Sequence, residues 1–510
     1  MTPRSIHERF SMTSPDTAPA ASAASAGSSE SAEHFDLIIV GTGSGNSIPN
    51  ESNENKKIAI VEKGIFGGTC INVGCIPTKM FVYTADVARE VNDLKRLSLD
   101  GKLTDVDWKG LQQRIFGDRI DPISEGGKEY RRGDRTPNIT LFDGTASFSG
   151  PKTLTIATNV DSASTTSAEA GDTVTITGDQ IVLATGGRPF IPDVIADSGV
   201  PYHTNNDIMR LDKLPDSLII MGGGIIAVEF AHIFSGLGTK VTVINRSPNV
   251  LRKLDETVVE RFNAVAKEQW TNKLGVDVTG ARHEGGQVIL SLSDGSEVAG
   301  DELLVALGRT KNSDLLNPQA GGVDVADNGR IIVDEYGRTS AEGVWALGDA
   351  ANDIELKHVA NAEQRVISHN LAHPDDLRTF NHRFVPSGIF THPQIGVVGM
   401  TEAEARDKVE NVTVKVQEYS DVAYGWAMED STGFCKLIAD ADSGKLLGAH
   451  IMGPQATTLL QLAVTMLNFD IDVRLMAKNQ YWPHPALSEL FENALLGLEF
   501  NSPNPDGMNP

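Results

Sequence analysis

The sequence predicts an α/β protein with two Rossmann-like dinucleotide-binding domains, followed by a C-terminal α+β domain. Two apolar runs, FDLIIV at 35–40 and LIIM at 218–221, each lead into a glycine-rich turn and then a second apolar run. Buried parallel strands typically give such continuous apolar runs, and a glycine turn between them lets main-chain amides approach a pyrophosphate. From about residue 383 the pattern changes to mixed strands and helices, which indicates a separate α+β domain.

Composition limits the class of partner and the compartment. The formal net charge of −24 argues against a nucleic-acid or anionic-membrane partner. No apolar run is long enough to span a bilayer. Three cysteines in 510 residues are too few for a secreted disulfide scaffold, so we expect a cytoplasmic protein.

The first glycine-rich turn is GTGSGN, which directly follows the first predicted strand. Gly41 and Gly43 allow the close approach of a pyrophosphate, and Glu62 lies about twenty residues on, where an acid can hold a ribose hydroxyl. Asn46 stands where a third glycine is expected, and proline and asparagine weaken the helix predicted after it. Taken alone, this turn leaves a plain loop as an alternative.

The segment GGTCINVGCIPTK, at 67–79, contains two of the three cysteines. A turn that opens into a helix could bring Cys70 and Cys75 within disulfide range, and a helix N-terminus lowers the pKa of a thiol. Gly68 permits close approach by a large planar group, and Pro77 is compatible with a first helical turn. No further Cys or His lies near enough in sequence to complete a zinc site, so we expect no metal; inert buried thiols remain an alternative.

Further along, alternating Thr, Val and Ile at 139–183 predict a β-meander with an exposed loop at 160–172. The second glycine turn, GGGIIA, brings Gly222, Gly224 and the small residue Ala227 to dinucleotide-type spacing. The strand after it is followed by an asparagine and two arginines, with no carboxylate to hold a free 2′-hydroxyl. Because guanidinium groups match a 2′-phosphate, Arg246 and Arg252 favour NADPH over NADH.

Together these motifs resemble the flavoprotein disulfide reductases, and the resemblance extends over about residues 35–500. It implies that FAD and NADPH are the cofactors and that Cys70 and Cys75 cycle between disulfide and dithiol. It further implies that Cys70 attacks the substrate and that Cys75 lies nearer the flavin. Cys435 is expected to be an ordinary, partly buried thiol.

The same resemblance assigns roles to residues whose types alone are ambiguous. Lys79 is expected beside the flavin, paired with Glu229, and Asp349 is expected on the ribityl chain, although it could instead cap the following helix. Ile225 stands where glutathione reductases have a tyrosine gate over the nicotinamide. The expected cofactor-binding residues are Gly41, Gly43, Glu62, Gly68, Thr69, Lys79, Gly186, Asp349, Gly222, Gly224, Ala227, Glu229, Arg246, Arg252 and Gly308.

Near the C-terminus, His484 lies between two prolines and is followed five residues later by Glu489. A carboxylate at this spacing can orient the imidazole for acid–base catalysis, although a lone histidine is more often structural. The resemblance implies that this histidine reaches the redox disulfide of the partner subunit, and therefore that the protein is a homodimer.

The resemblance also implies a domain order and a substrate class. Around 80–88 and 484–498 the sequence resembles the branch of the family that reduces mycothione, the disulfide of an inositol-linked cysteine conjugate. Reduction of glutathione disulfide and oxidation of dihydrolipoamide are the enzymatic alternatives, and a redox-sensing or assembly flavoprotein is the non-enzymatic one. The expected divisions are a disordered extension at 1–33, an FAD-binding domain at 34–187 and 310–382, an NADPH-binding domain at 188–309, a dimerisation domain at 383–500 and a disordered tail at 501–510.

Overall fold

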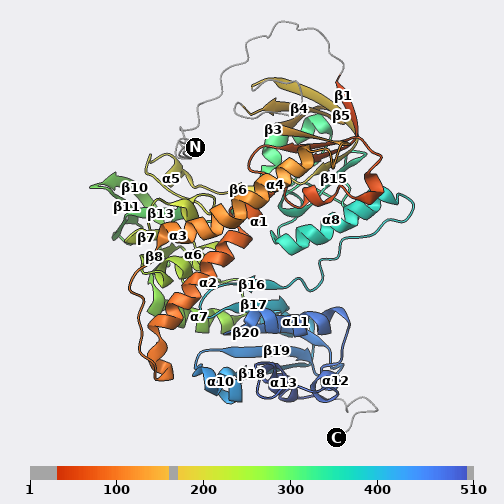
Figure 1. Ribbon diagram of the computed structural model, residues 1–510. Coiled ribbons are helices and arrows are strands. Elements are labelled where there is room, and N and C mark those ends of the chain that lie inside the picture. The colour runs from red at the N-terminus through yellow and green to blue at the C-terminus, as the bar shows by residue number, and fades with distance from the viewer. Residues whose placement is uncertain (1–31, 160–170, 502–510) are drawn as a thin grey trace.

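The computed structural model describes residues 32–159 and 171–501. The predicted extension, loop and tail lie outside the described residues, apart from one or two residues at their edges. The larger sheets occupy three separate regions of the molecule, with the C-terminal region in blue at the bottom of Figure 1.

The first sheet has six strands, in the order β1-β2-β3-β4-β5-β15, with a further pairing of β1 with β5. β1 is parallel to β2 and β5, and β5 is parallel to β15, as their continuous apolar runs predict. β3, β4 and β5 pair antiparallel, which confirms the predicted meander. The strands are β1 Glu33–Val40, β2 Ile58–Glu62, β3 Ile139–Gly150, β4 Thr153–Thr158, β5 Thr173–Leu183 and β15 Val344–Ala346.

The connection between β1 and β2 differs from the expected helix. It contains two 3-10 turns, Gly45–Ser47 and Glu51–Asn53. Asn50 accepts a hydrogen bond from the main chain of Ser52, and Asn53 accepts one from the main chain of Asn50. Asparagine side chains that bond nearby main chain compete with helical hydrogen bonds, so the segment stays in short turns.

The second nucleotide-type unit has its own parallel sheet in the order β13-β7-β8-β9. A small antiparallel sheet of β10, β11 and β12 is inserted in the chain between β9 and β13. The strands are β7 Ser217–Met221, β8 Lys240–Asn245, β9 Thr271–Leu274, β10 Val278–Glu284, β11 Gln287–Leu292, β12 Glu297–Gly300 and β13 Glu302–Val305.

The chain passes between the two nucleotide units on a pair of short antiparallel strands, β6 (Gly187–Pro189) and β14 (Arg309–Lys311). Gly186 and Gly308 directly precede these strands and have φ values of 61° and 130°. Such positive φ values favour glycine, which accounts for the glycine at each crossing.

The C-terminal region is built on one antiparallel five-stranded sheet in the order β16-β17-β20-β19-β18. Helices of the same region cover it, in agreement with the predicted α+β domain. The elements are β16 Ser387–Ile389, β17 Ile395–Gly399, β18 Val412–Glu418, β19 Phe434–Asp440, β20 Leu446–Met452, α9 Glu402–Lys408, α10 Ala423–Met428, α11 Ala456–Asn468, α12 Val473–Lys478 and α13 Ser488–Leu496.

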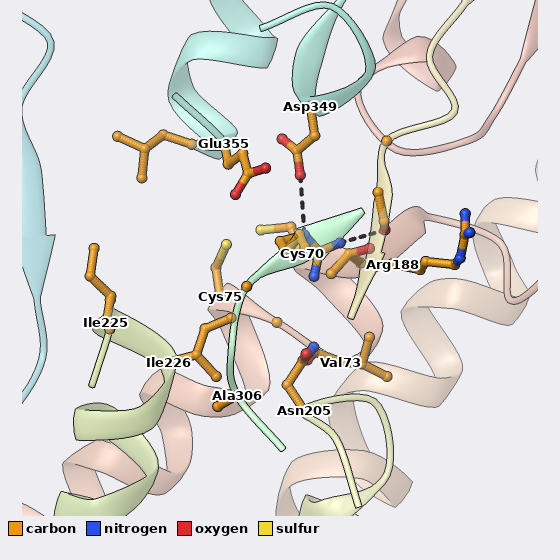
Figure 2. A pocket seen from close by; sticks show the side chains of 18 of the residues that line it. Cys70, Val73, Cys75, Arg188, Asn205, Ile225, Ile226, Ala306, Asp349 and Glu355 are labelled. Carbon is orange, nitrogen blue, oxygen red and sulfur yellow. Dashed lines mark hydrogen bonds and ion pairs between the residues drawn. The ribbon is translucent and has the colours of Figure 1, made fainter. Parts of the chain in front are cut away.

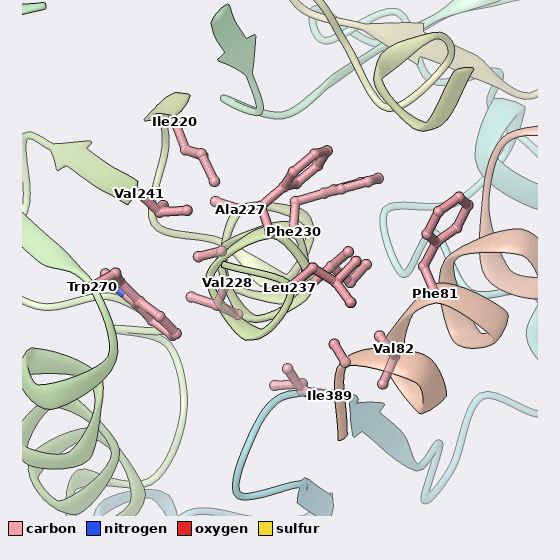
Figure 3. Close-up of a cluster of buried hydrophobic side chains, with 14 of the residues drawn as sticks. Phe81, Val82, Ile220, Ala227, Val228, Phe230, Leu237, Val241, Trp270 and Ile389 are labelled. Atoms are coloured by element: carbon pink, nitrogen blue, oxygen red, sulfur yellow. The ribbon is translucent and has the colours of Figure 1, made fainter. Parts of the chain in front are cut away.

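The helix that follows the cysteine pair packs on the helix that follows the second glycine turn. Phe81 and Val82 of the first helix meet Ala227 and Phe230 of the second in one buried cluster, drawn in Figure 3. The cluster fixes the redox helix against the second nucleotide unit. The helices of this part of the chain are α1 Gly68–Asn72, α2 Cys75–Asn92, α3 Trp108–Gln112, α4 Asp121–Arg132, α5 Asp193–Ala196, α6 Ile225–Gly236, α7 Glu256–Gln269 and α8 Lys357–Ala372.

Candidate active site

The two cysteines come from neighbouring helices and face one another. Cys70 lies in α1, and Cys75 is the first residue of α2, so the predicted turn that opens into a helix is present. Their sulfur atoms lie close together in Figure 2, and both are free thiols.

The two thiols differ in acidity. A hydrogen bond from Cys70, aided by the positive charge of Lys79, lowers the pKa of Cys75 to about 7, against the opposing effect of desolvation. The same hydrogen bond and burial raise the pKa of Cys70 above its ordinary value. The pair thus holds its negative charge on Cys75 and its remaining proton on Cys70, and Cys70 needs a base before it can act as a nucleophile.

The predicted contact between Lys79 and Glu229 is confirmed. The Lys79 ammonium donates to both carboxylate oxygens, at 2.7 and 2.6 Å, and lies 4.7 Å from the centre of the Phe390 ring. The main-chain N–H of Phe390 also donates to Glu229, at 2.9 Å. Glu229 therefore connects the redox helix, α6 and the start of the C-terminal region. Its contact with the redox helix is Lys79, which lies one helical turn after Cys75.

The first glycine turn has the geometry of a nucleotide cradle. A Cβ at Gly41 would lie 2.3 Å from a main-chain oxygen, while one at Gly43 would meet nothing within 4 Å. Glu62 accepts hydrogen bonds from Thr42 through its main-chain N–H and its hydroxyl, at 2.9 and 2.6 Å, and from the Gly64 N–H at 2.9 Å. A carboxylate offers about four acceptor positions, so Glu62 retains capacity for a ribose hydroxyl.

Other residues around this turn also fit a bound FAD. The hydroxyl of Thr185 is buried without a hydrogen-bond partner among the described residues, and it lines the same cavity as Gly68 and Thr69. Asp349, which lines it too, lies 3.6 Å from Arg309, and burial raises the pKa of its carboxyl. An unpaired hydroxyl and a half-buried acid beside an open glycine turn suit the polar chain of a flavin nucleotide.

The second glycine turn opens on that same cavity, whose volume is about 1670 Å³. A Cβ at Gly222 would lie 2.2 Å from a main-chain oxygen, whereas Gly224 faces open space. Arg246 and Arg252 are exposed at its edge and form no ion pair with a described carboxylate. Ala227 is fully buried in α6, as close helix–strand packing predicts.

Several cavity residues are absent from the sequence-based set, and Lys253, Lys357 and Asn205 are among them. Lys253 lines the cavity beside Arg252. Its position directly after Arg252 could have marked it as a nucleotide-binding residue. Lys357, the first residue of α8, donates to the hydroxyl of Ser44 at 2.9 Å, and its charge acts to lower the pKa of Cys70. Asn205 contacts the loop between the cysteines. Lys357 and Asn205 are remote in sequence from the groups they meet, so no local pattern marks them.

His484 and Glu489 form the predicted dyad. The imidazole Nδ1 lies 2.7 Å from the Glu489 carboxylate, which also accepts a hydrogen bond from the Ala486 N–H at 3.1 Å. The His484 side chain is 71% exposed, whereas that of Glu489 is 19% exposed. His484 does not line the cavity of its own chain, so the dyad is presented outward from the C-terminal region.

Cys435 is fully buried, where partial burial was expected, and burial raises the pKa of its thiol. Within residues 32–159 and 171–501, no group of three or more His, Cys, Asp or Glu side chains could hold a metal ion. None of the helices in this part of the chain combines the length and the apolar character needed to cross a membrane.

Two nucleotide cradles that open on one cavity with a thiol pair define a thiol–disulfide oxidoreductase that uses two nucleotides. Comparisons with known proteins agree with this class. Residues 35–364 match the family model "Pyridine nucleotide-disulphide oxidoreductase", and residues 385–495 match the dimerisation domain of the same family. The chain belongs to the pyridine nucleotide-disulphide oxidoreductase family.

Relatives with known names are similar over nearly the whole chain. Mycothione reductase of Mycobacterium tuberculosis is 48% identical over 91% of this chain and 100% of its own length. Glutathione reductase of Burkholderia cepacia is 31% identical over 90% of this chain and 97% of its own length. A solved structure of an HOCl-induced flavoprotein disulfide reductase of Escherichia coli, 24% identical, superposes with a TM-score of 0.78 over 91% of this chain and 100% of that one, which shows the fold.

Family membership confirms several predictions. The protein is a flavoprotein disulfide reductase, with FAD and a pyridine nucleotide as its cofactors. The matched dimerisation domain supports a homodimer, and the relatives support a small-molecule disulfide as the substrate.

Proposed function

We propose that this protein uses NADPH to reduce mycothione to mycothiol in the cytoplasm, and so maintains the thiol redox balance of the cell. The observation that carries this proposal is the 48% identity with the Mycobacterium tuberculosis mycothione reductase over that enzyme's entire length. The alternatives are less similar: glutathione reductase is 31% identical, and dihydrolipoyl dehydrogenase of Corynebacterium glutamicum is 29% identical.

Gly222 and Gly224 would hold the pyrophosphate of NADPH, and Arg246 and Arg252 would hold its 2′-phosphate. These two cations lie at the edge of the second nucleotide cradle without a carboxylate partner in the described chain, which supports the choice of NADPH over NADH. Gly41, Gly43 and Glu62 would hold FAD at the first cradle, and bound FAD would supply the redox chemistry that links NADPH to the Cys70–Cys75 disulfide.

The dithiol then reduces the substrate in two exchanges. Deprotonated Cys70 attacks one sulfur of mycothione, which forms a mixed disulfide and releases one mycothiol as thiolate. The partner subunit's His484 donates a proton to that thiolate, while Glu489 orients the imidazole. Cys75 then attacks the Cys70 sulfur, which releases the second mycothiol and restores the disulfide.

The acidity of the two thiols supports this division of roles. Cys75, whose pKa is about 7, carries the charge beside Lys79, where the flavin is expected. Cys70, whose pKa is raised, depends on a base, and an exposed His484 from the other subunit would supply it. The domain divisions predicted from the sequence place the FAD site, the NADPH site and this dyad on separate parts of the chain.

Steady-state oxidation of NADPH by the FAD-loaded dimer tests the proposal, with mycothione, glutathione disulfide and lipoamide compared at matched concentrations. We expect kcat/KM for mycothione to exceed those for the other two disulfides by at least about 100-fold, because buried polar contacts to a cognate substrate discriminate strongly. Preference for another disulfide would assign the protein to a neighbouring branch of the family. If no disulfide is reduced although FAD is bound, a redox-sensing or assembly role replaces the enzymatic one.

A further inference from the structure

One side chain of the second nucleotide unit holds the loop between the redox cysteines. The Asn205 Nδ2 donates to the main-chain carbonyl of Val73, at 3.1 Å. Val73 lies between α1, which carries Cys70, and α2, which begins at Cys75. Figure 2 shows Asn205 and Val73 together below the two sulfur atoms. Asn205 is buried, with 7% of its surface exposed.

The loop is held from two sides. From its own domain, the Asn72 side chain donates to the carbonyls of Phe66 and Gly68, at 2.9 and 3.0 Å. Among the described residues of the second nucleotide unit, only Asn205 makes a hydrogen bond to the segment 70–75. The position of the Val73 carbonyl thus depends on Asn205.

The segment that carries Asn205 is itself fixed to the parallel sheet of that unit. The main chain of His203 bonds to Leu303 and Val305 of β13, at 2.7 and 2.8 Å. Its imidazole lies between Asp207 and Glu302, and these hydrogen bonds raise the pKa of His203 to about 9 in spite of its burial. At neutral pH the imidazole is therefore charged and paired on both sides. These pairings hold the segment that carries Asn205 in place.

We propose that Asn205 is a positioning residue for the redox pair: its amide holds the Val73 carbonyl, and so keeps the sulfur atoms of Cys70 and Cys75 in attacking distance of each other. The proposal rests on the redox role proposed above for these cysteines. It adds that the geometry of the pair is set partly by the second nucleotide unit and not by the cysteine segment alone.

The effective concentration of one thiol at the other decides how readily the pair closes to a disulfide. Cys70 and Cys75 belong to different helices, so the main chain at 71–74 decides how often their sulfurs meet. A thiol pair closes to a disulfide more readily when its two members are held in the reacting geometry. Removing the donor leaves the Val73 carbonyl without its partner and frees the loop, so the disulfide becomes less favoured relative to the dithiol.

Two substitutions separate hydrogen bonding from packing. Asn205→Asp keeps the size and the planar end of the side chain but places an oxygen against the Val73 carbonyl. Asn205→Leu keeps the branching and cannot donate at any pH. The matched control is Asn468→Leu, which removes the same type of bond, from an asparagine amide to the carbonyl of Val464 at 2.8 Å, at an exposed position outside the cavity.

The measurement is the redox equilibrium of the full-length, FAD-loaded dimer in dithiothreitol buffers, read by mass spectrometry after alkylation of Cys70 and Cys75. Both Asn205 variants should lower the equilibrium constant for disulfide formation by about tenfold, which corresponds to about 30 mV. The control should match the wild type, and thermal unfolding should show that all variants are folded.

The outcomes distinguish this inference from the proposed function. Values within twofold of the wild type for both Asn205 variants would overturn the positioning role, as would a shift in Asn205→Leu alone, because the side chain would then act by polarity or packing without donating. A wild-type protein whose cysteines form no reversible disulfide would instead refute the proposed function itself.

Discussion

At the scale of single residues, the site depends on where one negative charge lies. Lys79 is paired with Glu229 at 2.6 Å, yet its charge still acts on Cys75. The carboxylate holds the ammonium in place, and the ammonium favours the thiolate of the neighbouring cysteine. The Lys79–Glu229 pair is therefore more than a structural ion pair, because the Lys79 charge adds to the Cys70 hydrogen bond that lowers the pKa of Cys75.

Lys79→Met should raise the pKa of Cys75 above its value of about 7, because a cation that favours the thiolate is lost. The thiolate fraction at pH 7 then falls, and alkylation of Cys75 by iodoacetamide slows. The pH profile of alkylation, with the modified cysteine identified by mass spectrometry, measures the shift. Lys57→Met removes a lysine from an exposed ion pair with Glu33 and serves as the control; equal profiles in both variants would contradict the assigned role.

The two arginines at the second cradle make a prediction about the nucleotide. Because a hydrogen bond to a charged group contributes about 1.5–3 kcal/mol, Arg246→Ala and Arg252→Ala should each raise KM for NADPH by about 10- to 150-fold. KM for NADH should change little, since NADH has no 2′-phosphate. A similar rise in KM for both nucleotides would show that the arginines do not bind the 2′-phosphate.

At the scale of elements, α2 and α6 are joined by two polar layers within an apolar cluster. The first is the pair Lys79–Glu229, and the second is centred on His232, which is fully buried. The His232 Nε2 lies 2.8 Å from the Asp86 carboxylate, and its Nδ1 lies 3.1 Å from Arg89. Burial lowers the pKa of His232, so the neutral ring donates to Asp86 and accepts from Arg89.

Asp86→Ala removes the acceptor of a buried donor and should destabilise the protein by about 1–3 kcal/mol. The free energy of unfolding from denaturant titration checks this value. Asp93→Ala, which removes a 66% exposed partner of Arg96, should change the stability by no more than about 0.5 kcal/mol. Equal effects would mean that the second polar layer contributes nothing specific to the packing of α2 on α6.

At the scale of the whole molecule, the strands and glycine turns were predictable because their signals are local. Apolar runs predict β1, β5 and β7, and the positive φ values of Gly41 and Gly222 account for their glycines. The absent helix after β1 shows the limit of that reasoning, since asparagine side chains there prefer to bond nearby main chain.

The contacts between sequence-distant residues were not predictable from local pattern. The pairing of Lys79 with Glu229 was expected from family resemblance alone, because the two residues lie 150 positions apart. The contacts of Asn205 with Val73 and of Lys357 with Ser44 join residues 132 and 313 positions apart. Their side chains are ordinary surface types in the sequence. The docking of the two nucleotide units brings Asn205 to the loop between the cysteines, whereas Lys357 meets Ser44 because α8 packs on the first sheet.

The most direct test of the account mixes two inactive variants, Cys70→Ser and His484→Ala, and lets their subunits exchange. If the dyad of one subunit serves the cysteines of the other, each hybrid dimer has one intact site. Because half of the dimers formed by random exchange are hybrids, the mixture should recover about one quarter of the wild-type rate of disulfide reduction. A mixture that stays as inactive as its two parents would contradict the account, since His484 would then serve the cysteines of its own chain.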